Sequence, residues 1–546
     1  MTNKMAALFS KAITSTLQSS RNPPPKVSLI SPYTFLNRLT FGPNSTSVEE
    51  FKKLGLNQWL DWQLRPQFED DPDCKERMAN FLLKIWYPAD KEGRWPAVNE
   101  KRKFWSLDKS PTELMKIIEP GKNSNYKEQF IPYEEVVFAS IIRSIYSQWQ
   151  VQEVITSFWH NHFSVNAMDG LAKILFPIYD QEVIRPHALG NFRTLLEAVA
   201  KSPVMLTYLN NNSSRVGAPN ENYAREFFEL HTLGVSAYLN NTYSRWKDVP
   251  GANNGRPIGY IDHDVRELAK VFTGWTVGNG APLGDGKNLP RTGEFIYIDA
   301  WHDPSPKRVL ANELYSNQGP LQDGLRALDL AAYHPATARF ISHKLCARLL
   351  MDNPPESLVK SAAQVWIAKQ HDSHQIAEVI RHIATSAEFA NTISTKIKRP
   401  IELLASFVRA TGQDFTPSDE LLFQISFCGQ TPYAWPTPEG LPDNNQRWLG
   451  ASVLLQRWNL ISGITENRWG CGVMNPFKLL DLTNKISALT LAKTCLNKIY
   501  GAENAPDISK QLMAAAKLAP NDLVSDPAIA RRMLAWSAMA PQFQIR

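Results

Sequence analysis

A long run of helical periodicity over residues 132–163 constrains the fold of this chain more than any other feature. Apolar side chains recur there at intervals of three and four positions, as Val136, Ile142, Trp149 and Phe158 illustrate. Such spacing places the apolar side chains on one face of an α-helix. The segment therefore predicts either one long helix or two helices in series.

Helical spacing also recurs along most of the remaining chain, and several segments open with a proline, which suits the first turn of a helix. The predicted helices cover residues 48–64, 186–201, 220–233, 264–272, 321–330, 335–350, 355–369, 374–385, 399–410, 452–464 and 506–517. Strand-like alternation is limited to residues 295–298 and 307–310, which predict at most one small β-hairpin. These patterns predict an all-α fold, a large multi-helix globular protein with long loops.

The chain is expected to divide into three regions. Residues 1–30 end in a proline-rich stretch and predict a flexible N-terminal arm. Residues 31–410 should form the main helical domain with the candidate site, and residues 411–546 a C-terminal helical region packed on it. Two long loops rich in Gly, Pro and Asn, 240–256 and 278–291, flank one of the predicted helices, a common setting for a binding site.

Composition excludes several classes of protein. Hydrophobic residues make up 43% of the chain and charged residues 21%, which is typical of a globular protein. The formal charge of +6 is small for 546 residues, and no basic stripe stands out, so nucleic acid is not an expected partner. No window is apolar enough for a membrane span. The five cysteines form no Cys-x-x-Cys pair, which argues against a disulfide framework. Since the N-terminus makes a poor signal peptide, a cytoplasmic location is expected.

Histidines and carboxylates gather between His160 and Asp303, and the first cluster is His160-Asn161-His162. Two residues apart on an unbroken helix, the two imidazoles would point about 200° apart and could not share a ligand. If the chain leaves the helix there, extended backbone would bring both to one side. A metal site and a pair of unrelated histidines, one in the core and one exposed, are equally compatible with the pattern.

A second cluster lies on the helix predicted at 220–233. Glu226 and Glu229 share one face of this helix, and Arg225 lies one turn before Glu229. Ordinary helix ion pairing is one interpretation, with each pair contributing about 0.2–0.5 kcal/mol. Neighbouring phenylalanines indicate that part of this face is buried, and a buried carboxylate needs an arginine, a metal or a proton as partner. Gly234 is expected to end the helix, which places His231 in its last turn.

Three shorter motifs complete the candidate site. Residues 179–187 place an acidic stretch before an Arg-Pro-His turn, which is interpreted as a capping network. Trp301-His302-Asp303 and His263-Asp264 could each supply a ligand or a general base from a loop.

From these clusters we predict three sets of site residues. The predicted metal ligands are His160, His162, Glu229 and His231. The predicted catalytic residues are Arg225, Glu226, His302 and Asp303. The predicted substrate-binding residues, for a small molecule or a peptide, are Trp159, Asn161, Asn222 and Trp275.

Histidine and carboxylate ligands without cysteine suit iron, manganese or zinc. A metal-dependent enzyme is therefore expected, with oxidoreductase chemistry favoured over zinc-dependent hydrolysis. A haem enzyme, a metal-free acid/base site built from carboxylate, arginine and histidine, and a non-catalytic helical scaffold with a structural polar core are the alternatives.

Several strings resemble the bacterial domain-of-unknown-function-1800 family. They occur in order at residues 35–43, 159–163, 179–192, 220–234, 265–275, 334–341 and 430–459. The resemblance implies a helical, enzyme-like domain with no established common activity. It also implies a location outside the cytoplasm, because members are often exported, and a partner protein resembling the sulfatase and alkaline phosphatase superfamily. The stretch 237–262 departs from the family pattern as an insertion.

Overall fold

A computed structural model describes residues 30–67, 71–121, 125–283, 286–483, 485–501 and 506–546. Helices dominate these ranges, which confirms the predicted all-α, multi-helix fold. The expected N-terminal arm, apart from residue 30, lies outside the described residues. None of the helices in the described part is long and apolar enough to cross a membrane.

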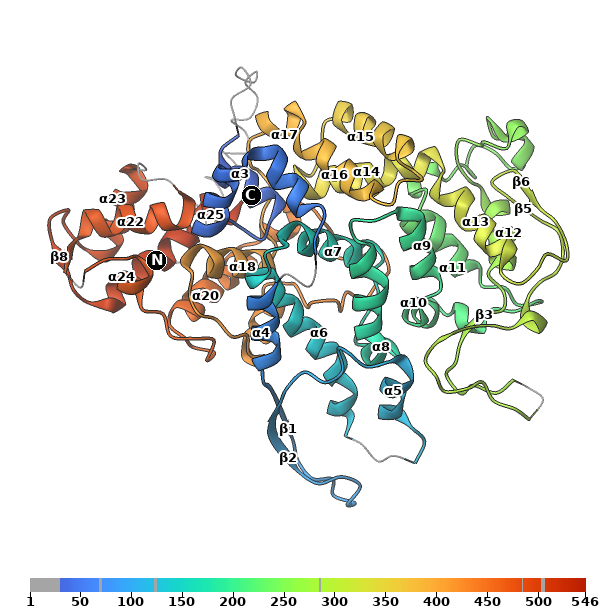
Figure 1. Ribbon diagram of the computed structural model, residues 1–546, viewed down its shortest axis with the longest axis horizontal. Helices are drawn as coiled ribbons and strands as arrows, with labels where there is room; N and C mark the ends of the chain where they lie inside the picture. Colours follow the sequence, from blue (N-terminus) through green and yellow to red (C-terminus); the bar gives the residue numbers. More distant parts are fainter. Residues whose placement is uncertain (1–29, 68–70, 122–124, 284–285, 484, 502–505) are drawn as a thin grey trace.

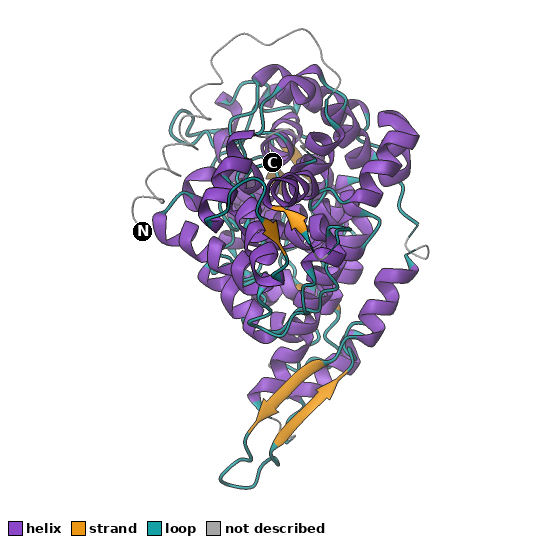
Figure 2. Ribbon diagram, turned by 90° about the vertical axis from the view of Figure 1, so that its left-hand side faces the viewer, coloured by secondary structure: helices purple, strands orange, loops and turns teal. Residues whose placement is uncertain are grey.

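The N-terminal elements include a β-hairpin that projects from the body of the molecule (Figures 1 and 2). They are α2 (Pro32–Leu39), α3 (Ser45–Gln63), α4 (Pro72–Asn80), β1 (Leu83–Tyr87), β2 (Val98–Arg102), α5 (Pro111–Met115) and η2 (Lys116–Ile118). Alternation along β1 buries Leu83 and Ile85 against α6 and leaves Trp86 in solvent. Residues 88–131 thus contain the strand β2, the short helices α5 and η2, and the start of the long helix α6 (Tyr126–Tyr146).

Two helices in series form the centre, as the periodicity of residues 132–163 allows. α6 (Tyr126–Tyr146) ends before a three-residue break, and α7 (Gln150–His162) follows. The Gln150 amide group stabilises this break, because its Nε2 donates to the Ser147 carbonyl over 2.8 Å and its Oε1 accepts from Phe41 N over 3.1 Å. The helices that follow are α8 (Ala172–Ile178), the π-helical turn η3 (Tyr179–Ile184), η4 (Arg185–His187), α9 (Phe192–Ala200), α10 (Pro203–Tyr208) and η5 (Asn211–Ser213).

The next region carries the second predicted cluster and the long loops. Its elements are α11 (Glu221–Glu226), the π-helical turn η6 (Phe227–His231), η7 (Val235–Ala237), η8 (Trp246–Asp248), η9 (Ala252–Asn254), α12 (Asp262–Val271), β3 (Trp275–Val277), β4 (Phe295–Tyr297), η10 (Asp299–Trp301), β5 (Lys307–Val309) and β6 (Asn312–Leu314). Gly234 ends the π-turn with φ of 85°, and a Cβ there would meet the Phe340 ring at 2.6 Å. The stretch 237–262 contributes most of a small apolar cluster around Val249 and Ile261.

The prediction of at most one β-hairpin is wrong. The two predicted strands do not pair with each other, because β4 pairs with β3 and β5 pairs with β6. Four two-stranded antiparallel sheets occur in the described residues. The strands β3 to β8 have only two or three residues, too few to produce the alternation by which a strand is recognised in a sequence.

The remaining elements build the rest of the helical body. They are α13 (Gln322–Ala332), α14 (Pro335–Leu349), α15 (Glu356–Ala368), α16 (Gln375–Ala384), α17 (Ala387–Asn391), α18 (Pro400–Thr411), α19 (Asp419–Phe427), η11 (Asn445–Trp448), α20 (Ala451–Thr465), α21 (Pro476–Leu479), β7 (Ile486–Ser487), α22 (Ala488–Tyr500), α23 (Pro506–Ala516), β8 (Leu523–Val524), α24 (Pro527–Met539) and α25 (Pro541–Gln544). One hydrophobic core extends from Phe35 to Phe543, and α18 packs on both α6 and α22 (Figure 1). The chain ends beside the start of α18, where Arg546 N donates to the Lys396 carbonyl over 2.8 Å.

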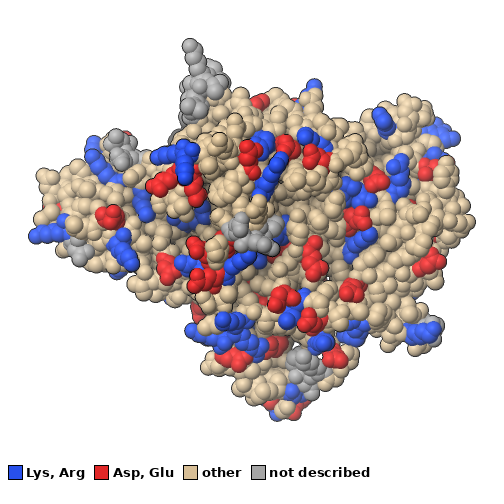
Figure 3. Space-filling view, viewed as in Figure 1, with Lys and Arg blue, Asp and Glu red and all other residues tan. Residues whose placement is uncertain are grey.

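Charged side chains of both signs are interspersed over the face shown in Figure 3, and much of that face carries neither sign. All five cysteines are buried free thiols.

Candidate functional site

A polar pocket of about 80 Å³ lies where the end of α7, the start of α18 and the loop 430–441 meet. Its walls include Glu153, His160 and Arg185 from the helical centre. Arg399, Tyr433 and Trp435 contribute from the C-terminal half of the chain. A water molecule occupies about 30 Å³ in the liquid, so the enclosed part has room for a small polar group.

His160 is the titratable residue at the centre of this pocket. Its Nε2 lies 2.9 Å from Oδ1 of Asp180, and both side chains are buried. Asp180 comes from the π-helical turn η3, in which the amide of Arg185 donates to the Asp180 carbonyl five residues back. π-helical turns inside helices occur frequently at functional sites. This turn places a carboxylate against an imidazole that a neighbouring helix supplies.

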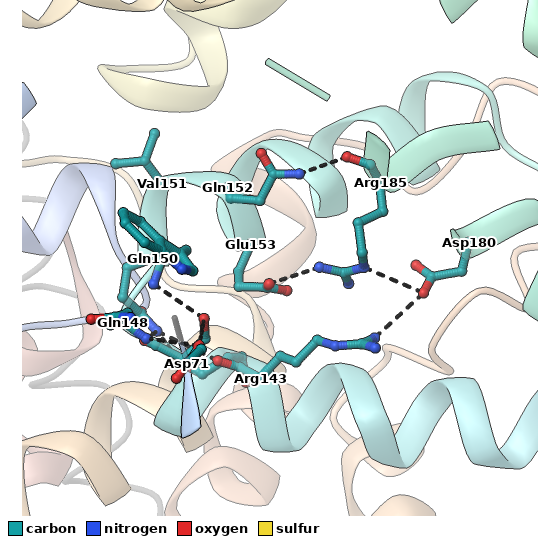
Figure 4. A network of polar contacts seen from close by, with 12 residues as sticks. Asp71, Arg143, Gln148, Gln150, Val151, Gln152, Glu153, Asp180 and Arg185 are labelled. Atoms are coloured by element: carbon teal, nitrogen blue, oxygen red, sulfur yellow. Dashed lines mark hydrogen bonds and ion pairs between the residues drawn. The ribbon is translucent and has the colours of Figure 1, made fainter. Parts of the chain in front are cut away.

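Two arginines surround the same carboxylate (Figure 4). Arg185 bridges two acids, with Nη1 at 2.7 Å from Glu153 Oε1 and Nε at 3.5 Å from Asp180 Oδ2. Arg143 reaches Asp180 Oδ2 at 3.4 Å. Burial alone would raise the pKa of Asp180, but Arg185, His160 and Arg143 together hold it well below its usual range. Asp180 is therefore a carboxylate at neutral pH, and His160 donates its Nε2 proton to it.

The other ring nitrogen of His160 is available. Nδ1 forms no hydrogen bond with any residue in the described ranges, and His160 lines the pocket. The Tyr433 ring packs against the imidazole, with ring centroids 4.7 Å apart. Because Nε2 carries its proton toward Asp180, neutral His160 presents Nδ1 as a proton acceptor.

Polar groups without partners mark other parts of the pocket wall. Thr156 Oγ1, Arg399 Nε and Trp435 Nε1 are buried, and no group in the described part of the chain forms a hydrogen bond with them. Buried polar atoms of native proteins nearly always have a hydrogen-bond partner. Three such atoms lie around this pocket, where water or a ligand can satisfy them.

The family model with the description "Protein of unknown function (DUF1800)" matches residues 34–545 of the chain. The chain belongs to this family. No curated protein and no solved structure is significantly similar to it.

In this DUF1800 protein the predicted ligands His160 and His162 face different surroundings, because α7 continues through both residues. His162 Nε2 lies 3.1 Å from the carbonyl oxygen of His231 and donates to it. Lys344 Nζ donates to His162 Nδ1 over 2.8 Å. Burial, then Lys344, lowers the pKa of His162 well below its usual range. Both ring nitrogens of His162 are therefore engaged.

The other two predicted ligands lie apart from the pocket. His231 is fully buried, its Nε2 has no partner among the described residues, and burial lowers its pKa to about 3. Glu229 lies 3.5 Å from Arg225. Among the described residues, no group of three or more His, Cys, Asp or Glu side chains is arranged to hold a metal ion. The four predicted ligands are thus divided among three places, and the expected metal ion has no ligand set there.

The predicted catalytic residues of α11 form a half-exposed ion network. Arg225 binds Asp262 at 3.2 Å in addition to Glu229. Burial, then the nearby Glu229 carboxylate, raises the pKa of Glu226. Asn222 is exposed on the same helix. The Arg225–Glu229 pair is the ion pairing along a helix that was one interpretation of this cluster.

His302 lines a second, separate pocket. It pairs with Asp323 rather than with Asp303. His302 Nε2 lies 3.0 Å from Asp323, and its Nδ1 donates to the Thr273 carbonyl over 2.9 Å. Two acceptors on one imidazole require two ring protons, and accordingly the pKa of His302 is raised, although burial opposes this. Asp303 instead accepts a hydrogen bond from Ser305 N over 2.9 Å. These contacts favour the imidazolium form of His302.

Two of the four predicted substrate-binding residues are packing residues. Trp159 and Trp275 are fully buried, and Trp159 Nε1 donates to the Ala188 carbonyl over 2.9 Å. Asn161 does line the pocket, where its amide group makes two hydrogen bonds with the backbone of Leu441 and so holds the loop 430–441.

Sequence reasoning missed Glu153, Arg143 and Tyr433, and it interpreted residues 179–187 as a capping network. The sequence did contain a usable signal for Asp180 and Arg185, because both residues lie close to His160 in the chain. The other members come from α6, α7 and a loop nearly 300 residues away, and no local pattern connects them.

Proposed function

We propose that the chain is an enzyme in which His160 transfers a proton to or from a small polar substrate bound in the central pocket. The observation that carries this proposal is the His160–Asp180 pair, whose free Nδ1 belongs to a pocket-lining side chain. A positioned imidazole contributes a rate factor of about 10²–10⁴ as general acid or base.

The role of Asp180 is to orient the imidazole and to stabilise the imidazolium that forms when Nδ1 accepts a proton. Arg143 and Arg185 support this role, because they keep Asp180 ionised. Glu153 balances Arg185 at the other side. The proton therefore moves between His160 and the substrate while Asp180 remains a carboxylate.

The unpartnered polar atoms favour an enzyme over a non-catalytic scaffold. A structural polar core is stable only when its members satisfy one another. The pocket instead leaves Thr156 Oγ1, Arg399 Nε and Trp435 Nε1 without partners in the described part of the chain. These atoms would bind and orient the substrate next to His160.

The proposal is tested by incubating the protein with a pool of small polar metabolites and measuring their consumption by mass spectrometry. Wild type is compared with His160→Gln, which removes the proton acceptor, and with His374→Gln, which changes an exposed histidine. We expect at least one compound to be consumed by wild type and by His374→Gln and to persist with His160→Gln. Equal turnover by all three proteins would sink the proposal.

A transition metal is not part of this proposal. Iron, manganese or zinc, as predicted from the sequence, would have to bind through residues other than the four named ligands as they lie here. Elemental analysis of the purified chain tests that prediction directly.

A further inference from the structure

We infer that the part of the pocket wall formed by Arg399 and Trp435 binds an oxyanionic group, a carboxylate or a phosphate, of the molecule that enters the pocket. The inference rests on the proposed function in naming the substrate class for the same pocket. It is carried by hydrogen-bond donors and by buried charge, which are independent of His160.

Arg399 is buried at the start of α18 and lines the pocket. One edge of its guanidinium is engaged, since Nη2 lies 3.0 Å from Asp443 Oδ2. Its Nε is buried and has no partner among the described residues, and the same is true of Trp435 Nε1 on this wall. Both atoms can only donate a hydrogen bond. A ligand that satisfies them must present acceptor oxygens.

The buried charges behind this wall have an excess of cations. Four largely or fully buried cationic side chains are connected there by ion pairs: Arg348, Lys396, Arg399 and Arg546. Three carboxylates accompany them: Asp352, Glu402 and Asp443. A desolvated excess of positive charge is unfavourable unless an anion compensates it.

The pKa of Arg348 agrees with that excess. Burial, then the neighbouring Arg546, lowers the pKa of Arg348 to about 10. The Arg348 guanidinium is fully buried, and its Nε and Nη1 have no hydrogen-bond partner among the described residues. The protein thus carries more buried N–H groups than acceptors in this region.

Glu402 limits where an anion can bind, because its own carboxylate already occupies part of the cation cluster. Its Oε2 accepts from Arg399 N over 2.7 Å, and its Oε1 pairs with Arg348, so the carboxylate closes the inner end of the cation cluster. Arg399 lies on the pocket side of this cluster. An oxyanion there would accept from Arg399 Nε and Trp435 Nε1, within the same pocket as the Nδ1 of His160.

The test is isothermal titration calorimetry on the full chain with inorganic phosphate and with acetate, at constant ionic strength set by sodium chloride. We expect at least one of the two oxyanions to bind with one-to-one stoichiometry. Arg399→Gln should weaken that binding about tenfold or more, because it removes a charged hydrogen-bond donor. Trp435→Phe should weaken it several-fold. The matched control Arg245→Gln, at an exposed arginine paired with Asp248, should leave it unchanged.

Circular dichroism shows whether Arg399→Gln folds, and if it does not, Trp435→Phe alone decides the result. The inference is overturned if neither oxyanion binds wild type at tens of millimolar, or if the folded pocket variants bind as tightly as wild type. Binding of phosphate alone or acetate alone identifies which oxyanion the pocket takes.

His160→Gln separates this inference from the proposed function. If it binds the anion and turns over substrate like wild type, the anion site stands and the acid/base proposal fails. If His160→Gln loses turnover and wild type does not bind the anion, the acid/base proposal stands and the anion site fails.

Discussion

Two histidine–aspartate pairs of nearly equal length occur in this protein, and they differ in what the second ring nitrogen does. The Nε2 atoms of His160 and His302 lie 2.9 and 3.0 Å from Asp180 and Asp323. Nδ1 of His302 also donates to the Thr273 carbonyl. Nδ1 of His160 has no partner in the described ranges. A short distance between a histidine and a carboxylate therefore occurs both at a site available for proton transfer and at a site where the histidine has a structural role.

The surroundings explain the difference. Asp180 is paired with two arginines, so its charge is already balanced before the imidazole accepts a proton. Asp323 has Lys307 at 2.9 Å, and the Thr273 carbonyl adds a second acceptor that favours the imidazolium. A free nitrogen at a pocket wall, rather than the pair itself, distinguishes the candidate catalytic histidine.

The largest expected effect is a difference in kcat between variants of the two histidines. With a substrate identified by the metabolite screen, His160→Gln should lower kcat about 10²–10⁴-fold, because the proton acceptor is lost. His302→Gln should change kcat less than about threefold, since this histidine does not reach the central pocket. Steady-state kinetics measures both, and similar losses in the two variants would erase the distinction.

The next effect concerns the carboxylate of the first pair. Asp180→Asn keeps the shape of the side chain but leaves Arg143 and Arg185 with an uncompensated charge in a buried site. We expect the free energy of unfolding to fall by about 3–5 kcal/mol. Urea denaturation measures it, with Asp248→Asn, at an exposed ion pair, as the variant that should not change. A loss below about 1 kcal/mol would mean that water reaches these arginines.

A smaller effect on stability is expected at two buried threonines, Thr273 beside His302 and Thr156 in the central pocket. Thr273 Oγ1 accepts from Asp303 N over 2.8 Å and donates to the Lys270 carbonyl over 2.5 Å. Thr156 Oγ1 has no partner in the described part of the chain. Thr273→Val should therefore destabilise the protein by about 1–3 kcal/mol, whereas Thr156→Val should be nearly neutral without ligand. Thermal unfolding of both variants checks this, and equal losses would show that Thr156 is satisfied internally.

The smallest effect is a pH dependence that belongs to the second pair alone. Folding raises the pKa of His302 above its usual value of about 6.5, so its stabilising contribution is present below that pH. The contribution is lost as the pH rises through the raised folded-state pKa. The stability difference between wild type and His302→Gln should thus shrink from pH 6 to pH 9 in urea denaturation. A difference that stays constant would argue against a cationic His302.

Helix positions were predictable from the sequence because burial of one helix face imposes a strong period. The segments at 335–350 and 374–385 correspond closely to α14 (Pro335–Leu349) and α16 (Gln375–Ala384). The strand pairs formed by β3 to β8 were not predictable, because each joins strands of only two or three residues. The break between α6 and α7 depends on the Gln150 side chain and its distant contact with Phe41, which periodicity does not report.

The candidate site was predictable only in part. His160 and Asn161 were recognised, but His160 was grouped with His162 because the two are close in sequence. Helix geometry places them in different surroundings. The true partner, Asp180, lies in a π-helical turn, which has no clear sequence signature. The contribution of Arg399 and Trp435 depends on long-range packing and could not be inferred from spacing.

The most direct measurement of the central claim is the protonation state of His160 by nitrogen NMR on protein labelled at histidine, with His160→Gln used for assignment. Spectra are recorded as the pH is raised until the ring-nitrogen shifts no longer change. The hydrogen bond to Asp180 predicts the neutral tautomer with its proton on Nε2 and an unprotonated Nδ1. A proton on Nδ1 would contradict the assignment of this atom as the acceptor in the pocket.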